Sequence, residues 1–186
     1  VSGTTLINAG YNNITLDDVN NDFTGAVKLT GVNVTLRDAN ALLLGESTVK
    51  GTLNITAGGD VTQSAALTVG GVMTVTAAKD ATKYDIILNN SSNDFKRAVK
   101  LTGNNVSLTD QNALQLGLST INGNLTVNAG DAVSQSGALE VRGATNISAG
   151  NGAAKYDINL SNNNQFIGPV TLTGQNVTLN TSGPLY

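Results

Sequence analysis

The chain has 186 residues, a formal net charge of −3, 12% charged and 4% aromatic residues, 21 glycines, and no cysteine or histidine. The missing residue types exclude disulfides, thiol nucleophiles and histidine-based catalytic or metal sites. The ten Lys and Arg are scattered, and no apolar run approaches the ~20 residues that span a bilayer, so we expect no nucleic-acid partner and no membrane insertion.

Short alternating segments rich in β-branched residues follow one another along the chain. The predicted strands that finish in Gly or Ala begin with Val27–Leu29, Leu53–Ile55, Met73–Val75, Val99–Leu101, Leu125–Val127, Thr145–Ile147 and Val170–Leu172. Two more short strands lie between successive members, for example Val34–Leu36 and Leu42–Leu44. A period of two with one apolar face is typical of half-buried strands, and no sustained 3.6-residue period predicts a helix.

The alternation also predicts which side chains point inward. We expect one continuous core that contains Val27, Leu29, Val34, Leu36, Leu53, Ile55, Val99, Leu101, Val106, Leu108, Leu125 and Val127. Lys28 and Lys100 should lie outside it. Gln63 and Gln135 share the parity of the inward aliphatic residues, so we expect them to be structural and to bond backbone groups at the corners.

The sequence repeats with a long period. Residues 26–31 (AVKLTG) return at 98–103, and residues 21–23 (NDF) return at 93–95 and, loosely and one position early, at 164–166. We therefore expect a single segment, 1–186, with long repeats 26–97 and 98–168 and partial repeats 1–25 and 169–186. Each long repeat should hold three coils. Phe23, Phe95 and Phe166 should fill the same coil corner, and Tyr84 and Tyr156 should cover an outer face.

Two architectures use such strands: a pair of antiparallel sandwich domains and a parallel β-helix. The short sub-repeats have the length of single coils, whereas a sandwich would not require sub-repeats of this length. The chain also lacks the aromatic residues that would fill a sandwich core about 10 Å thick. The sequence therefore favours an all-β, parallel β-helix (β-solenoid) with three-strand coils of about 20–26 residues.

Two segments carry a resemblance to a known family. Residues 51–70 (GTLNITAGGDVTQSAALTVG) and 21–36 (NDFTGAVKLTGVNVTL) resemble the repeats of filamentous-haemagglutinin-like exoproteins, the giant bacterial adhesins of the two-partner secretion type. The resemblance covers essentially the whole chain. It implies a right-handed β-helix shaft that passes an outer-membrane transporter unfolded and is secreted or displayed on the Gram-negative cell surface. It also implies a role in cell adhesion and virulence.

The chain departs from this family in one respect. The family's secretion domains carry Asn-Pro-Asn motifs, whereas the prolines here are Pro169 and Pro184, neither in that setting. The chain therefore resembles the shaft and not the secretion signal. Host or bacterial cell-surface receptors or glycans are expected to bind other regions of a longer parent protein.

Few side chains carry chemistry. The carboxylates considered for catalysis are Asp17, Asp18, Asp22, Asp85, Asp94 and Asp157, and we interpret them as corner residues that satisfy backbone donors. Gly58-Gly59-Asp60 is interpreted as a turn and not as a calcium-binding repeat. Asn-x-Ser/Thr triplets occur at Asn33, Asn54, Asn105, Asn124, Asn146 and Asn176, and corner geometry explains them without glycans. We expect no catalytic, cofactor-binding or metal-binding residues, and no enzymatic activity.

The expected function is that of a structural shaft segment of a large secreted adhesin or exoprotein, which positions a binding region away from the cell. The alternative is a β-helix module that binds carbohydrate or another copy of itself. An exposed row of aromatic residues on one face would favour this alternative. A third reading is a polysaccharide-degrading β-helix, which should show an acidic cluster beside a lysine or arginine in a groove.

Overall fold

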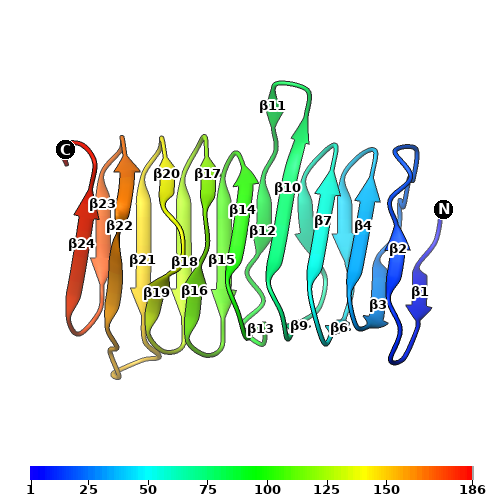
Figure 1. Ribbon diagram of the computed structural model, residues 1–186, viewed down its shortest axis with the longest axis horizontal. Helices are drawn as coiled ribbons and strands as arrows, with labels where there is room; N and C mark the ends of the chain where they lie inside the picture. Colours follow the sequence, from blue (N-terminus) through cyan, green and yellow to red (C-terminus); the bar gives the residue numbers. More distant parts are fainter. Residues whose placement is uncertain (186) are drawn as a thin grey trace.

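The computed structural model describes residues 1–185 as an all-β solenoid of about nine turns, with no helix in that range. Figure 1 shows the turns stacked along one axis, with the two ends of the chain at opposite ends of the stack. Every pair of adjacent strands is parallel except the small hairpin of β10 (Met73–Lys79) and β11 (Thr82–Lys83). The predicted β-solenoid is confirmed, and the sandwich alternative is wrong.

Two sheets form the two faces of the stack. The first contains β1 (Thr5–Asn8), β3 (Val27–Gly31), β5 (Leu42–Leu44), β6 (Ser47–Val49), β8 (Val61–Gln63), β9 (Leu67–Val69), β12 (Ile86–Leu88), β13 (Asp94–Phe95), β15 (Val106–Asp110), β18 (Leu125–Ala129), β21 (Thr145–Ala149) and β23 (Val170–Thr173). The second contains β10, β11, β2 (Ile14–Leu16), β4 (Val34–Asp38), β7 (Leu53–Ala57), β14 (Val99–Gly103), β16 (Leu114–Leu116), β17 (Ser119–Ile121), β19 (Val133–Gln135), β20 (Leu139–Val141), β22 (Ile158–Phe166) and β24 (Val177–Thr181).

A typical turn has two unequal sides. In the turn from Leu42 to Ala57, the short strands β5 and β6 lie on one face and the longer strand β7 lies on the other. Such a turn has the three strands that the sequence predicts. The stretch from Val27 to Asp38 is different, because β3 and β4 are both long and only Val32 and Asn33 separate them.

The expectation of three coils in each long repeat is wrong. Three turns carry the chain from Val34 through Leu53 and Met73 to Val99, all in the second sheet. Val106 is the equivalent of Val34, yet it lies in the first sheet. The long repeat therefore spans about three and a half turns. The successive repeats present equivalent strands on opposite faces.

Similar spacings between strand starts arise here in two different ways. This explains why the sequence predicted the wrong number of turns in each long repeat. The stretch from Val27 to Leu53 crosses one and a half turns, because Val27 lies in the first sheet and Leu53 in the second. The equally long stretch from Met73 to Val99 forms a single turn, which the β10–β11 hairpin lengthens. Spacing alone cannot separate these cases.

The core is a narrow aliphatic column between the two sheets. Every aliphatic side chain predicted to point inward is 2% exposed or less, whereas Lys28 and Lys100 lie outside the core. Phe23, Phe95 and Phe166 are buried, but they do not share one corner of the coil as predicted, because Phe95 lies in the first sheet and Phe166 in the second. Because burial of each large aliphatic side chain contributes about 1.5–3 kcal/mol, this column supplies the main driving force for folding.

Candidate functional site

The structure separates most of the carboxylates that the sequence singled out. Asp17 and Asp18 are exposed in the loop after β2, where the Asp18 Oδ1 accepts a hydrogen bond of 2.8 Å from the Asn20 N–H. Asp94 accepts from the Asn112 side-chain amide and forms a 2.6 Å ion pair with Lys96. These interactions agree with the interpretation of such residues as corner groups.

Asp85 and Asp157 belong to ladders that run along the corners of the stack. The Asp85 Oδ1 accepts hydrogen bonds from the backbone and side chain of Asn105 and from the side chain of Asn104. Asp157 bonds Asn176 in the same way. Burial alone would raise the pKa of Asp85, but the hydrogen bonds from Asn105 and Asn104 outweigh it and hold the pKa below its ordinary value of 3.8.

The two inward glutamines join buried asparagines. The Gln63 Nε2 donates to the Ala65 carbonyl at 2.6 Å and to the Asn93 Oδ1 at 2.8 Å, and the Asn93 Nδ2 donates back to the Gln63 Oε1 at 2.9 Å. Gln135 and Asn164 repeat the pair. The predicted corner bonds of the glutamines are confirmed. The asparagine partners were not anticipated, although the recurring NDF motif marks their position.

Two buried carboxylates escaped the sequence interpretation. Asp38 and Asp110 are 2% and 1% exposed. One oxygen of Asp110 accepts from the Phe95 N–H and the other from the Asn112 N–H, both at 2.8 Å. Asp38 does the same with Phe23 and Asn40. The signal was available, because each aspartate shares the parity of the aliphatic residues in its own strand.

Burial raises the pKa of Asp110 above its ordinary value of 3.8. The hydrogen bonds from the Asn112 and Phe95 amides offset part of this rise, the charge of Asp94 adds to it, and Lys96 opposes it. Asp94, Lys96 and Asp110 thus place two carboxylates and a lysine at one corner. Both oxygens of Asp110 are nevertheless occupied by backbone donors, which makes this group a structural element of the corner.

The Asn-x-Ser/Thr triplets fall into two environments. Asn33, Asn105 and Asn176 lie at corners, where the side-chain amide donates to Asn13, Asp85 and Asp157, respectively. Asn54 and Asn146 lie within strands and point outward, exposed. The corner asparagines therefore have the structural role that the sequence suggests.

Gly58 and Asp60 occupy a tight corner. A Cβ added to Gly58 would meet the Ala39 carbonyl oxygen of the turn below, and the Asp60 Oδ1 accepts a hydrogen bond from the Asp85 N–H. Among residues 1–185 no group of three or more acidic, His or Cys side chains is arranged to hold a metal ion. That range also contains no helix of the length and hydropathy needed to cross a membrane.

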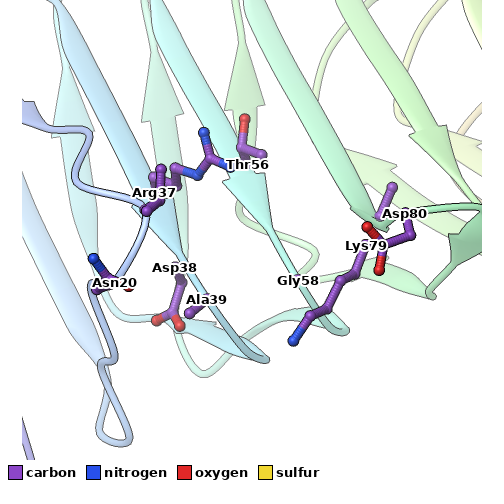
Figure 2. A pocket seen from close by; sticks show the side chains of 10 residues that line it. Asn20, Arg37, Asp38, Ala39, Thr56, Gly58, Lys79 and Asp80 are labelled. Carbon is purple, nitrogen blue, oxygen red and sulfur yellow. The ribbon is translucent and has the colours of Figure 1, made fainter.

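The clearest concave surface lies between two loops. A cleft of about 400 Å³ separates the loop at Val19 and Asn20 from the β10–β11 hairpin. Its floor includes Arg37 from β4 and Thr56 from β7, and its far wall carries Lys79. Figure 2 shows Arg37 lying between Asn20 on one side and Lys79 on the other. We call this surface the first cleft.

The same cleft recurs in the next repeat. A pocket of about 210 Å³ is lined by Ser91, Thr109, Asp110, Gln111, Asn128, Ala129, Gly130, Gly150 and Asn151. Except for Ala129, each of these residues lies one long repeat after a residue of the first cleft. Because the repeat advances by half a turn, this second cleft lies on the opposite sheet. The second cleft lacks both cations, because Thr109 occupies the position equivalent to Arg37 and Asn151 the position equivalent to Lys79.

Comparisons with known proteins agree with the repetitive architecture. Residues 1–30, 31–102 and 103–173 match a family described as repeats of unknown function (DUF5649). No curated protein and no solved structure matches the chain. The matched segments are successive and cover most of the 186 residues, and the chain belongs to this family of repeats.

Proposed function

We propose that this chain is a structural shaft segment of a large secreted bacterial adhesin or exoprotein of the filamentous-haemagglutinin-like, two-partner secretion type. The observation that carries the proposal is the stack of about nine turns on one continuous core. In such a stack each turn rests on its neighbours, so length grows with the number of repeats at about 4.7–4.9 Å per turn. A rod of this kind holds a binding region away from the cell surface.

The remaining parts of the proposal follow from this role. The shaft passes an outer-membrane transporter unfolded, and the absence of cysteine suits that route, since no disulfide can form before export. Host or bacterial receptors and glycans bind other regions of the parent protein. No catalytic step is assigned to the chain, because its buried carboxylates Asp38 and Asp110 are bonded to backbone amides.

The location is tested in the bacterium that makes the protein. Antibodies raised against the folded chain should label intact cells or detect the protein in the medium, and protease added to intact cells should remove the cell-bound signal. A signal that appears only after cell lysis contradicts the proposal.

The rod geometry is tested by removing one repeat. Deletion of residues 26–97 joins Gly25 to Ala98, a junction nearly identical to the native step from Gly25 to Ala26. The product should fold and be shorter by about three and a half turns, or roughly 17 Å at the strand spacing of a sheet. Small-angle scattering measures the long dimension. A folded product of unchanged length contradicts the role of a spacer.

A second candidate function is carbohydrate binding. The sequence alternative relied on an exposed aromatic row. The recurring cleft favours this function for a different reason, because polar side chains from two loops and two or more strands converge on a concave surface.

A further inference from the structure

We propose that the first cleft binds an acidic saccharide that carries at most one carboxylate on each sugar. This inference goes beyond the shaft role, since a spacer needs no ligand. It rests on the size and lining of the first cleft, on two cations that form no salt bridge in the described range 1–185, and on the comparison with the second cleft, which lacks both cations.

The cleft has the dimensions of a ligand site. Its volume of about 400 Å³ falls within the roughly 300–1,000 Å³ of small-molecule sites. Two loops wall it. One contains Val19 and Asn20, and the other is the β10–β11 hairpin, which projects beyond the neighbouring turns at the upper edge in Figure 1. The floor is the outer surface of the sheet, so the ligand lies across adjacent strands.

Arg37 and Lys79 are the groups of the cleft that could receive an anion. Arg37 and Lys79 are both exposed, and neither forms a salt bridge with any residue of the described range 1–185. Asp38 and Asp80 also line the cleft, but neither forms a salt bridge with Arg37 or Lys79, and Asp38 is 2% exposed. A guanidinium group presents paired donors that match a carboxylate. Lys79 adds a second positive charge from the opposite wall.

The neighbouring groups narrow the class of anion. Thr56 and Asn20 offer a hydroxyl and an amide beside the cations, which suits a ligand with many hydroxyl groups. Asp17 and Asp18 stand in the loop that forms one wall, and Asp80 lies at the rim. These carboxylates, together with the net charge of −3, disfavour a more densely charged polyanion such as a heavily sulfated glycan. A sugar acid with one charge per residue meets both conditions.

The second cleft supplies a matched control. Thr109 and Asn151 occupy the places of Arg37 and Lys79, so the solenoid already accommodates these residues at equivalent positions. The double variant Arg37→Thr with Lys79→Asn should therefore fold like the parent chain and lose only the charge of the first cleft.

The experiment measures binding of four probes to the full chain by calorimetry or NMR titration. The probes are tetragalacturonate, sialyllactose, the neutral galactose tetramer and an acidic peptide of equal charge. We expect at least one acidic sugar to bind and to bind more tightly than the neutral tetramer. Its affinity should fall at least tenfold in the Arg37→Thr, Lys79→Asn variant.

Several outcomes overturn the inference. They are the absence of binding by both acidic sugars at millimolar concentration, equal binding by the neutral tetramer, and unchanged affinity in the Arg37→Thr, Lys79→Asn variant. Equal or tighter binding of the acidic peptide means that the cleft recognises a protein and not a glycan. None of these results bears on the shaft, because surface labelling and the length of the deletion variant are measured independently of any ligand.

Discussion

The two long repeats of the solenoid share their inward-facing residues and differ in their outward-facing residues. In β4 the inward residues are Val34, Leu36 and Asp38, and the equivalent residues of β15 are again valine, leucine and aspartate. The outward residues Thr35 and Arg37 become serine and threonine. Close packing limits the volume and shape of inward side chains, whereas an outward side chain meets mainly solvent.

Where an outward residue is retained, the structure supplies a packing reason. Lys28 and Lys100 are equivalent and both lie outside the core. The aliphatic stem of each runs over a glycine of the next turn, Gly45 and Gly117, respectively, so closely that an added Cβ would collide with it. The two repeats therefore preserve contacts between turns, whereas residues on the open surface are free to differ.

The largest effect is expected from placing a charge in the shared core. Leu101→Asp buries an unpaired carboxylate in place of a side chain that is 1% exposed. It should cost about 4 kcal/mol or more and unfold at least the local turns. Leu29→Asp should act alike, because Leu29 is the equivalent residue. Urea unfolding followed by circular dichroism measures both. Thr102→Asp, on the outer surface of the same strand, should cost less than about 1 kcal/mol.

A smaller effect should separate two copies of the buried asparagine. Asn93 bonds Gln63, the Leu67 N–H, and the carbonyls of Leu88 and Thr109. Asn93→Ala leaves several of these groups unsatisfied and should cost about 2–4 kcal/mol.

The matched variant is Asn21→Ala, because Asn21 makes the equivalent bond to the Leu16 carbonyl and has no glutamine partner in the described chain. It should cost about 1 kcal/mol. The two free energies of unfolding come from the same urea titrations. Equal costs would show that the Gln63–Asn93 pair contributes nothing measurable.

The hairpin turns should show a still smaller difference. Asp80 has a φ of 53°, and its equivalent Gly152 has a φ of 59°, a left-handed conformation in which a Cβ is unfavourable. Asp80→Gly should therefore raise the free energy of unfolding by a few tenths to about 1 kcal/mol, and Gly152→Ala should lower it by about 1 kcal/mol. Thermal unfolding measures both, and a loss of stability in Asp80→Gly contradicts the assignment of strain.

The finest distinction concerns the protonation of two aspartates. The pKa of Asp110 is raised above 3.8 and the pKa of Asp85 is lowered below it. The contribution of Asp110 to stability should improve as the pH falls through its raised pKa, because the folded state then takes up the proton first. The contribution of Asp85 is present above its unfolded pKa and lost as the pH falls through the lowered one.

Carbon-detected NMR titration of the side-chain carboxyls measures the two midpoints. Asp110 should titrate above 3.8 and Asp85 below it. Midpoints in the reverse order would show that hydrogen bonding at the Asp110 corner outweighs its burial.

Local patterns in the sequence predict much of the fold. Alternation of polar and apolar residues identified the strands, the inward aliphatic residues and the inward Gln63 and Gln135, because side chains alternate across a strand whatever the strand pairs with. The long repeat identified a stack of similar units. The alternation also places Asp38 and Asp110 among the inward residues of their strands. Their burial was missed because a charged residue after an apolar series is easily taken for a strand end.

The remaining features depend on contacts between turns that a local pattern does not encode. The number of turns in each repeat follows from which strands pair, and the pairing places Val34 and Val106 on opposite sheets. The bond between Gln63 and Asn93 joins residues 30 positions apart. The first cleft exists because four successive turns bring Asn20, Arg37, Thr56 and Lys79 to one surface. The sequence by itself determined the strands and their inward faces, whereas tertiary pairing decided the half-turn offset and the clefts, because only stacking brings distant loops to one surface.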